Sequence, residues 1–332
     1  MMHILVSADF ARQHEKAVRE VVGADCKLVV ADPVSGTPPS GLEEVEAAFL
    51  SLDLMGGRDE TGAHPRLRFF SQVADQTPNL RWIHTQAAGA DREVLQKAMG
   101  RGAVVTTSSG ASSQAVAHTA IAGMLALARG VPRWVRAQEQ KVWSTPTRDQ
   151  WPRDINGSKA LIIGTGPIGQ AIARIAKAMD MDVTGVRRKA ELLAGFDAML
   201  TFPQMHEVLP QIDWVFLACP LTRETRGFVD AAFIEKLPEH ARIVNVARGE
   251  VVSSKVVREA LIDGRLAGYY SDVFEGEPLG SESEWWDTPR TLMSAHLAAA
   301  STGYGPRTVE YFLDNLRRYV SKQPLRNVVA PH

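Results

Sequence analysis

The chain has 332 residues, about twice the size of a usual domain, and this length predicts two domains. Its 37 basic and 38 acidic residues give a net charge of −1, which argues against a nucleic-acid binder that depends on overall positive charge. Two cysteines, Cys26 and Cys219, are too few for a disulfide framework or a cysteine-rich metal site, so we expect no metal. No apolar run has the roughly 20 residues of a membrane span, and the N-terminus lacks a signal-peptide pattern. We therefore expect a cytoplasmic protein that contacts no membrane.

Short apolar runs alternate with helical patterns in the first third of the chain. A helical pattern covers residues 91–99, and Ser112 or Ser113 is a candidate N-cap for a helix whose apolar body spans residues 115–128. Strands that are separated by helices need crossover connections, so the pattern indicates a parallel sheet. The predicted strands cover residues 2–7, 26–31, 80–86 and 104–108.

A second series of strands and helices follows. A Gly-rich turn comes after its first strand, and six strands with such a turn are typical of a doubly wound nucleotide-binding domain. The last helix, residues 302–322, comes after this series and could return to pack on the first domain. The polar segment 134–151 carries Trp134, Trp143 and Trp151, and it forms either a loop over a site or an arm that packs on a partner subunit. The predicted strands cover residues 160–163, 181–186, 214–218, 242–247, 266–273 and 291–294.

The segment KALIIGTGPIGQAIARIAKAM places Gly164, Gly166 and Gly169 in the G-x-G-x-x-G spacing between a predicted strand and a predicted helix. Gly164 permits the tight turn, Gly166 lets the backbone approach a pyrophosphate, and Gly169 lets the helix pack close to the strand. The helix start then offers free N–H groups to the anion. The alternative is a Gly-rich turn that binds no ligand.

The end of the next predicted strand carries a basic pair, Arg187 and Arg188. Arg187 stands where an acidic residue normally accepts hydrogen bonds from the ribose of NAD. Guanidinium groups would instead bind a 2′-phosphate through charge-assisted hydrogen bonds. We therefore expect NADP(H) to be preferred, with NAD(H) possible. The alternative is a basic turn that only faces water.

Several motifs together resemble the D-isomer-specific 2-hydroxyacid dehydrogenases nearly from end to end, and the likeness is greatest to glyoxylate/hydroxypyruvate reductase-like members. The resemblance implies an α/β fold with two doubly wound parallel-sheet domains. A flavodoxin-like substrate-binding domain would comprise residues 1–108 and 301–332, and a Rossmann dinucleotide-binding domain residues 109–300. It also implies a homodimer, in which the tryptophan-bearing segment would serve as the arm. The motifs are GTGPIGQAIA, CPLTRETRGF, IVNVARGEVV, SDVFEGEP and MSAHLAAAS.

The resemblance assigns catalysis to Arg248, Glu277 and His296. Arg248 would hold the carboxylate and keto oxygen of a substrate, and His296 would donate a proton to the ketone oxygen. Glu277 would orient the imidazole and favour its protonated form. Without the motifs, the three residues would be a surface arginine, a structural histidine and a solvated loop carboxylate. The proline that usually precedes the histidine is Ala295 here.

The resemblance also implies binding roles outside this catalytic set. Asp272 would bond the nicotinamide carboxamide, although an aspartate in a loop can equally cap a turn. The backbone amides of Ala88 and Gly89 match a loop that binds the substrate carboxylate. Cys219 lies in a binding segment, and no base is paired with it in the motif, so a nucleophilic role is not expected. The full cofactor-binding set is Gly164, Gly166, Pro167, Ile168, Gly169, Arg187, Arg188, Cys219, Pro220, Thr225, Ala247 and Asp272.

These observations predict NADPH-dependent reduction of a small 2-keto acid, such as glyoxylate or hydroxypyruvate, to the D-2-hydroxy acid. The stereochemistry is implied by the resemblance alone. One alternative is a corepressor-like protein that senses NAD(H) on the same fold and binds peptide partners. A second alternative is phosphite oxidation on the same scaffold. Turnover of a small keto acid separates the first alternative from the predicted enzyme.

Overall fold

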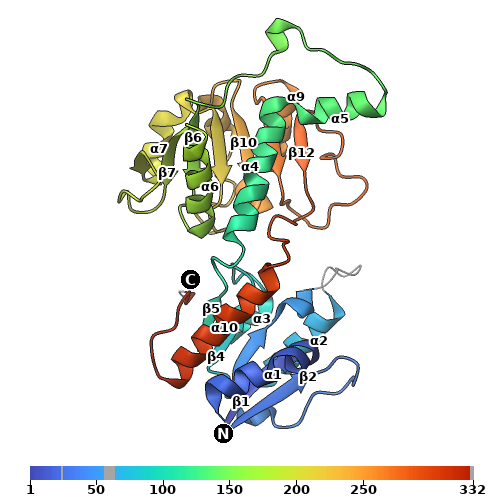
Figure 1. The fold of residues 1–332 in the computed structure, drawn as a ribbon, viewed down its shortest axis with the longest axis vertical. Coiled ribbons are helices and arrows are strands. Elements are labelled where there is room, and N and C mark those ends of the chain that lie inside the picture. Colours follow the sequence, from blue (N-terminus) through green and yellow to red (C-terminus); the bar gives the residue numbers. More distant parts are fainter. Residues whose placement is uncertain (24, 56–63, 330–332) are drawn as a thin grey trace. The chain divides into compact units, whose positions relative to one another are not determined.

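Two parallel sheets organise the chain, and helices cover both faces of each sheet (Figure 1). The computed structural model describes residues 1–23, 25–55 and 64–329. The chain divides into unit 1, Met1–Ser112 with Ser301–His332, and unit 2, Ser113–Ala300. The predicted fold class, two parallel-sheet α/β domains, is confirmed.

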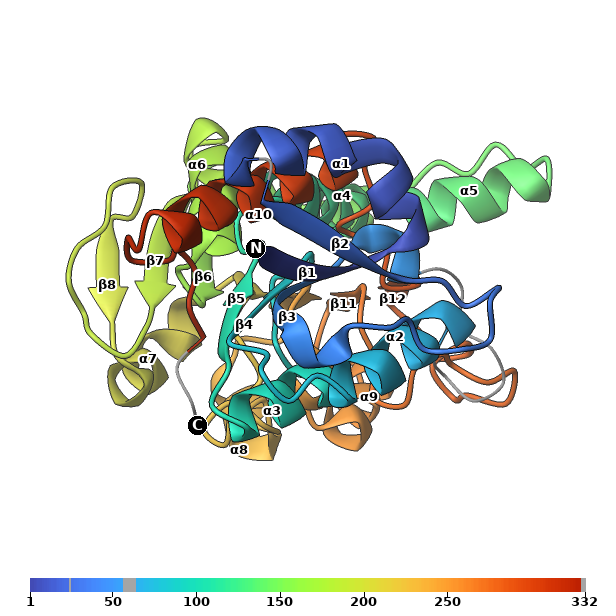
Figure 2. The ribbon, with the colours of Figure 1, turned by 90° about the horizontal axis from the view of Figure 1, so that it is seen from below.

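In the described part of unit 1, five parallel strands lie in the order β2-β1-β3-β4-β5, which is the flavodoxin-like order. Helices α1 (Ala8–Val22) and α10 (Tyr304–Val320) cover one face, where Phe10 and Phe312 pack around Phe49. Helices α2 (Pro65–Asp75) and α3 (Glu93–Gly100) cover the other face (Figure 2). The strands are β1 (Met2–Ser7), β2 (Cys26–Ala31), β3 (Val45–Leu50), β4 (Trp82–Thr85) and β5 (Val104–Thr107).

The central strand of this sheet, β3, is absent from the sequence-based prediction. Its sequence, VEAAFL, contains alanine and glutamate, which are poor strand formers by propensity. The strand forms because β1 and β4 flank it and bury nearly all of its side chains. Tertiary context therefore overrides local preference at this position.

A buried histidine in β4 makes the stability of the protein depend on pH. His84 Nδ1 lies 2.7 Å from Thr106 Oγ1, and its Nε2 lies 3.0 Å from Ser108 Oγ. Burial lowers the pKa of His84 to about 3. The unfolded chain binds this proton with a pKa of about 6.5, so the contribution of His84 to stability is complete above that pH and is lost as the pH falls toward 3.

We expect the titration of His84 alone to lower the free energy of unfolding by about 2 kcal/mol between neutral pH and about pH 5. Urea denaturation of the wild type and of His84→Gln at several pH values measures this contribution. Glutamine keeps a polar side chain at this position but does not titrate. Equal pH dependence in the two proteins would contradict the prediction.

In the described part of unit 2, seven strands lie in the order β12-β11-β10-β9-β6-β7-β8. The order reverses between β6 and β9, as in the Rossmann fold, and ligands bind outside the carboxyl ends of the strands at such a point. Helices α4 (Ser113–Arg129) and α6 (Pro167–Ala178) cover one face. Helices α7 (Phe202–Val208), α8 (Ala231–Lys236) and α9 (Ser254–Ile262) cover the other. The strands are β6 (Lys159–Ile163), β7 (Asp182–Val186), β8 (Ala198–Leu200), β9 (Trp214–Leu217), β10 (Arg242–Asn245), β11 (Gly268–Ser271) and β12 (Thr291–Met293).

The sequence-based prediction missed β8, a strand of three residues at the sheet edge. So short an apolar run carries little periodic signal, and it becomes a strand through its pairing with β7. Short 3₁₀ turns complete the described elements of the chain: Leu42–Glu44, Leu52–Met55, Arg148–Gln150, Leu209–Gln211 and Gly249–Val251.

Helix α5 (Val131–Glu139) and the segment after it, up to Trp151, project from unit 2 (Figures 1 and 2). The predicted polar segment is thus partly helical. Trp143 is 96% exposed, and Trp134 and Trp151 are also exposed.

Within the described ranges no single helix is long and apolar enough to cross a membrane. Helices α4 and α5 reach that length and composition only as a pair, which is bent by 69°.

Candidate active site

The Gly-rich loop after β6 has the geometry that a dinucleotide pyrophosphate requires. Gly164 has φ +98°, and a Cβ added there would lie 2.5 Å from the Cys219 backbone nitrogen. A Cβ on Gly169 would lie 2.0 Å from the Gly164 carbonyl oxygen. By contrast, no atom lies within 4 Å of a Cβ added to Gly166, so this position faces open space.

Helix α6 begins at this open space. Pro167 is its first residue and has no N–H group, so Ile168 and Gly169 carry the first amides of the helix. These two amides lack an acceptor one turn earlier in the helix, as in the first turn of any helix. Free amides and the positive end of the helix dipole suit an anion, so the loop fits the pyrophosphate of a dinucleotide.

The basic pair follows β7, the strand next to β6. Arg187 is half-buried, and its backbone N–H donates to the Leu200 carbonyl. Arg188 is exposed, and its Nε lies 3.5 Å from Glu224 Oε2 in the loop after β9. Sequence reasoning missed Glu224, because the pairing joins two loops that are far apart along the chain.

The segment after β9 is held by its own side chains. The Thr225 hydroxyl donates to the Pro220 carbonyl at 2.7 Å and accepts from the Thr222 N–H at 2.8 Å. The Cys219 side chain is buried in the core, and burial raises the pKa of its thiol to about 12. The thiol is therefore neutral near pH 7, and its lack of nucleophilic character agrees with the sequence argument.

Arg248 lies in the loop after β10, and a buried asparagine shapes that loop. Asn245 Nδ2 donates to the Arg248 carbonyl at 3.1 Å, and Asn245 Oδ1 accepts from the Ala247 N–H at 3.0 Å. Arg248 Nη1 donates to the Ala247 carbonyl at 2.7 Å. The Asn245 side chain thus sets the backbone path from which the Arg248 guanidinium extends.

Gly249 brings this loop into backbone contact with the loop that carries Glu277. A Cβ on Gly249 would lie 2.1 Å from the Phe274 carbonyl carbon and 2.2 Å from the Glu275 nitrogen. Both neighbours are backbone atoms, so no side-chain rotation would relieve the clash. Sequence reasoning missed Asn245 and Gly249 as site residues, although both lie inside the motif that pointed to Arg248.

The structure brings His296 and Glu277 together. His296 Nδ1 lies 2.6 Å from Glu277 Oε2, while Glu277 Oε1 accepts from the Phe274 N–H at 2.8 Å. The Glu277 side chain is largely buried, whereas the imidazole is 43% exposed. One carboxylate oxygen is thus held by the backbone, and the other orients an imidazole that solutes can reach.

Asp272 caps the turn that carries His296. His296 has φ +54°, a left-handed conformation that is uncommon outside glycine. Asp272 Oδ1 accepts from the Leu297 N–H at 2.8 Å and from the Ser294 hydroxyl at 2.6 Å. Its Oδ2 accepts from the Ala298 N–H at 3.0 Å, and its carbonyl accepts from the His296 N–H at 2.8 Å. The buried Asp272 carboxylate therefore stabilises the strained turn, while its nicotinamide role stays a prediction.

In unit 1, Ala88 and Gly89 lie in the loop after β4. The Tyr304 hydroxyl donates to the Gln86 carbonyl at 2.8 Å, and the Ser108 N–H donates to the Ala87 carbonyl at 3.0 Å. These contacts hold the start of the loop. In the part of the chain that the structure describes, the Ala88 and Gly89 amides bond no protein acceptor, so both are available to an anion.

Comparison with known proteins decides the family. Residues 121–298 match the NAD binding domain of the D-isomer specific 2-hydroxyacid dehydrogenases. The chain is also 33% identical over 254 residues to a glyoxylate reductase of Pyrococcus horikoshii, which covers 75% of this chain and 76% of that protein. The chain belongs to the D-isomer specific 2-hydroxyacid dehydrogenase family.

Solved structures of two other members extend the likeness over the whole chain. This 2-hydroxyacid dehydrogenase is similar to a family protein from Aeromonas salmonicida, with 26% identity, a TM-score of 0.79 and 99% of each chain covered. It is also similar to the enzyme from Xanthobacter autotrophicus Py2 in complex with NADPH and MES, with 26% identity and a TM-score of 0.78. That match covers 100% of this chain and 99% of the other. The protein is an NAD(P)-dependent oxidoreductase that acts on the CH–OH group of small 2-hydroxy acids or on the corresponding keto acids.

Proposed function

We propose that this dehydrogenase uses NADPH to reduce a small 2-keto acid, such as glyoxylate or hydroxypyruvate, to the D-2-hydroxy acid. The 2.6 Å contact between His296 and Glu277, in a loop packed on the Arg248 loop, carries the proposal. The Pyrococcus relative, which is named a glyoxylate reductase, supports a small substrate. The NADPH in the Xanthobacter structure supports the choice of cofactor.

Each catalytic residue has one task in this proposal. The planar Arg248 guanidinium binds the substrate carboxylate and the neighbouring keto oxygen. Glu277 engages Nδ1 of His296, so Nε2 is the nitrogen that gives a proton to the keto oxygen. The Glu277 carboxylate holds the imidazole in place for this transfer. NADPH, when bound, supplies the hydride that reduces C2 of the keto acid.

Each unit has its own binding task in this proposal. Unit 1 supplies the Ala88 and Gly89 amides for the substrate carboxylate and acts as the substrate-binding domain. Unit 2 acts as the dinucleotide-binding domain. Its Gly-rich loop binds the pyrophosphate of NADPH and its basic pair binds the 2′-phosphate. The remaining contacts to the cofactor come from Cys219, Pro220, Thr225, Ala247 and Asp272.

Initial rates of NADPH and NADH consumption with a panel of keto acids test the proposed function. The panel includes glyoxylate, hydroxypyruvate and phenylpyruvate. We expect rapid NADPH consumption with one of the two smaller acids. Turnover of phenylpyruvate alone would contradict the small-substrate proposal, and turnover with NADH alone would contradict the cofactor proposal.

Arg187→Asp is expected to lower the ratio of kcat/KM for NADPH to that for NADH by about ten- to hundredfold. The change removes charge-assisted hydrogen bonds to the 2′-phosphate and adds a charge that repels it. Steady-state kinetics with both cofactors measures the ratio. Lys255→Asp makes the same charge change on the exposed surface of α9 and serves as the control. An unchanged ratio in Arg187→Asp would show that the basic pair does not select the cofactor.

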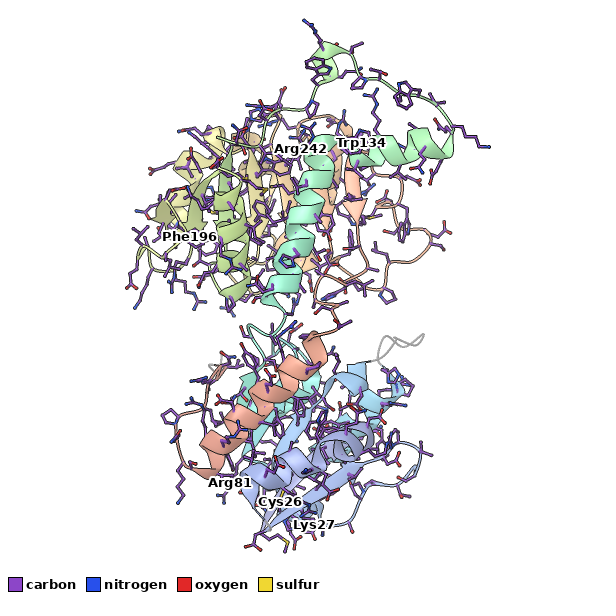
Figure 3. All side chains as sticks on the ribbon, in the orientation of Figure 1. Cys26, Lys27, Arg81, Trp134, Phe196 and Arg242 are labelled. Atoms are coloured by element: carbon purple, nitrogen blue, oxygen red, sulfur yellow. The ribbon has the colours of Figure 1, made fainter. Side chains whose placement is uncertain are left out.

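We also propose that the arm formed by residues 131–151 pairs with a second copy of the chain. Its large apolar side chains are exposed, and Figure 3 shows Trp134 on α5, away from the sheet. Exposed aromatic groups of this kind are common in interfaces between subunits. Sedimentation equilibrium that finds only monomers at micromolar concentration would contradict this proposal.

A further inference from the structure

A cavity of about 230 Å³ lies at the amino edge of the unit 2 sheet. Its wall contains the starts of β9 and β10, together with the segment that returns from the arm and leads into β6. The Gly-rich loop, Arg248 and His296 instead follow the carboxyl ends of strands. The charged and aromatic side chains around the cavity are Arg153, Asp154, Asp213, Trp214, His240 and Arg242.

Arg242, labelled in Figure 3, is a half-buried cation in the wall of this cavity. Its guanidinium carbon stacks over the ring of the buried Trp214, at 5.2 Å from the ring centroid. Among the described residues, its one side-chain hydrogen bond runs from Nη1 to the His240 carbonyl at 3.4 Å, and no carboxylate oxygen lies within ion-pair distance of the guanidinium. Burial and the nearby Arg153 lower the pKa of Arg242, while Asp213 acts in the opposite direction. A half-buried cation with so few acceptors favours an added anion.

Neither of the two carboxylates that line the cavity forms an ion pair with the Arg242 guanidinium. Asp213 Oδ1 lies 2.8 Å from His240 Nε2, and its Oδ2 accepts from the Lys159 N–H at 2.8 Å. Asp213 also lies 3.7 Å from Arg153 Nη2. Asp154 is exposed, and among the described residues it makes no ion pair with Arg242. The Nε and Nη2 groups of Arg242 therefore remain available to a ligand.

We propose that this cavity binds a small oxyanion, with phosphate as the model ligand, between the guanidinium groups of Arg242 and Arg153. The arginine fork matches the oxygen geometry of phosphate and of carboxylates. The cavity is smaller than the roughly 300 to 1,000 Å³ of typical organic-ligand pockets, so it suits a compact ion. Arg153 belongs to the segment that returns from the arm, and Arg242 begins β10. A bound anion would therefore tie the base of the arm to the sheet.

Isothermal titration calorimetry with inorganic phosphate tests this site. The enzyme is saturated with NADP⁺, so that the cofactor occupies its own phosphate-binding groups, and the ionic strength is kept constant. We expect wild type to bind phosphate, and Arg242→Gln and Arg153→Gln to weaken this binding by about ten- to hundredfold. Arg174→Gln removes an exposed arginine of α6 and should bind phosphate as the wild type does. Arg153 is also exposed, so its variant tests the site even if Arg242→Gln fails to fold.

Two results would overturn the proposal. Equal phosphate binding by wild type, Arg242→Gln and Arg153→Gln would place the anion elsewhere, for example at Arg248. Absence of binding to wild type, with weaker self-association of Arg242→Gln in sedimentation experiments, would instead assign Arg242 to a carboxylate of a second copy of the chain.

Discussion

Replacing His296 with alanine is expected to lower kcat for keto-acid reduction by a factor of about 10² to 10⁴, the usual contribution of general acid catalysis. The imidazole is 43% exposed, so solutes can reach it, and a carboxylate holds it at 2.6 Å from Glu277. Without it, the keto oxygen would have to take its proton from water. The dissociation constant for NADPH should change little, because the proposed task of His296 concerns the substrate. Stopped-flow or steady-state kinetics with the best keto acid, together with a fluorescence titration of NADPH, measures both quantities.

Two further variants separate proton donation from general damage. Glu277→Gln keeps the shape of the partner but removes its charge, so we expect a smaller loss in kcat than in His296→Ala. His118→Ala removes an exposed histidine of α4 that has no assigned role and should retain activity. If kcat of His296→Ala equals that of the wild type, the proton comes from another group.

Arg248→Gln is expected to lower kcat/KM for the keto acid by about 10² to 10⁴. Two charge-assisted hydrogen bonds to the substrate are lost, and each contributes about 1.5 to 3 kcal/mol. Most of the loss should appear in KM if Arg248 binds the ground-state carboxylate, and in kcat if its contact with the keto oxygen strengthens in the transition state. The dissociation constant for NADPH, measured by fluorescence titration, should stay close to that of the wild type.

Arg248→Lys tests the geometry of this contact. Lysine keeps the positive charge but cannot offer two parallel donors, so we expect an intermediate loss. Equal activity of the lysine variant and the wild type would show that charge alone suffices. Equal kcat/KM of Arg248→Gln and the wild type would remove Arg248 from the proposed site.

The strands with β-branched runs were predictable because their signal is local. The runs that became β1, β2, β6 and β9 are rich in valine, isoleucine and leucine, and each lies close to its predicted range. Strands β3 and β8 gave no such signal. They are strands because they pair with neighbouring strands, and this pairing cannot be predicted from the local sequence.

The features of the site also divide into those that a local sequence pattern predicts and those that require the fold. The sequence by itself determined the Gly-rich turn, because the spacing of Gly164, Gly166 and Gly169 between a strand and a helix is a local pattern. It also pointed to Arg248, Glu277 and His296 as candidates through their motifs. Their mutual arrangement required the fold, since Glu277 and His296 are separated along the chain and meet only when their loops follow neighbouring strands.

Only the tertiary structure decided how the candidate residues are supported. The close approach of Gly249 to Phe274 and the capping of the His296 turn by Asp272 involve atoms from different loops. The residues that line the cavity beside Arg242 likewise come from segments that are far apart along the chain. A sequence motif specifies residue types and spacing, whereas hydrogen-bond geometry and close backbone contacts arise only when distant segments pack against each other. The sequence therefore predicted the family and its candidate chemistry, and the tertiary structure decided which groups hold each candidate in place.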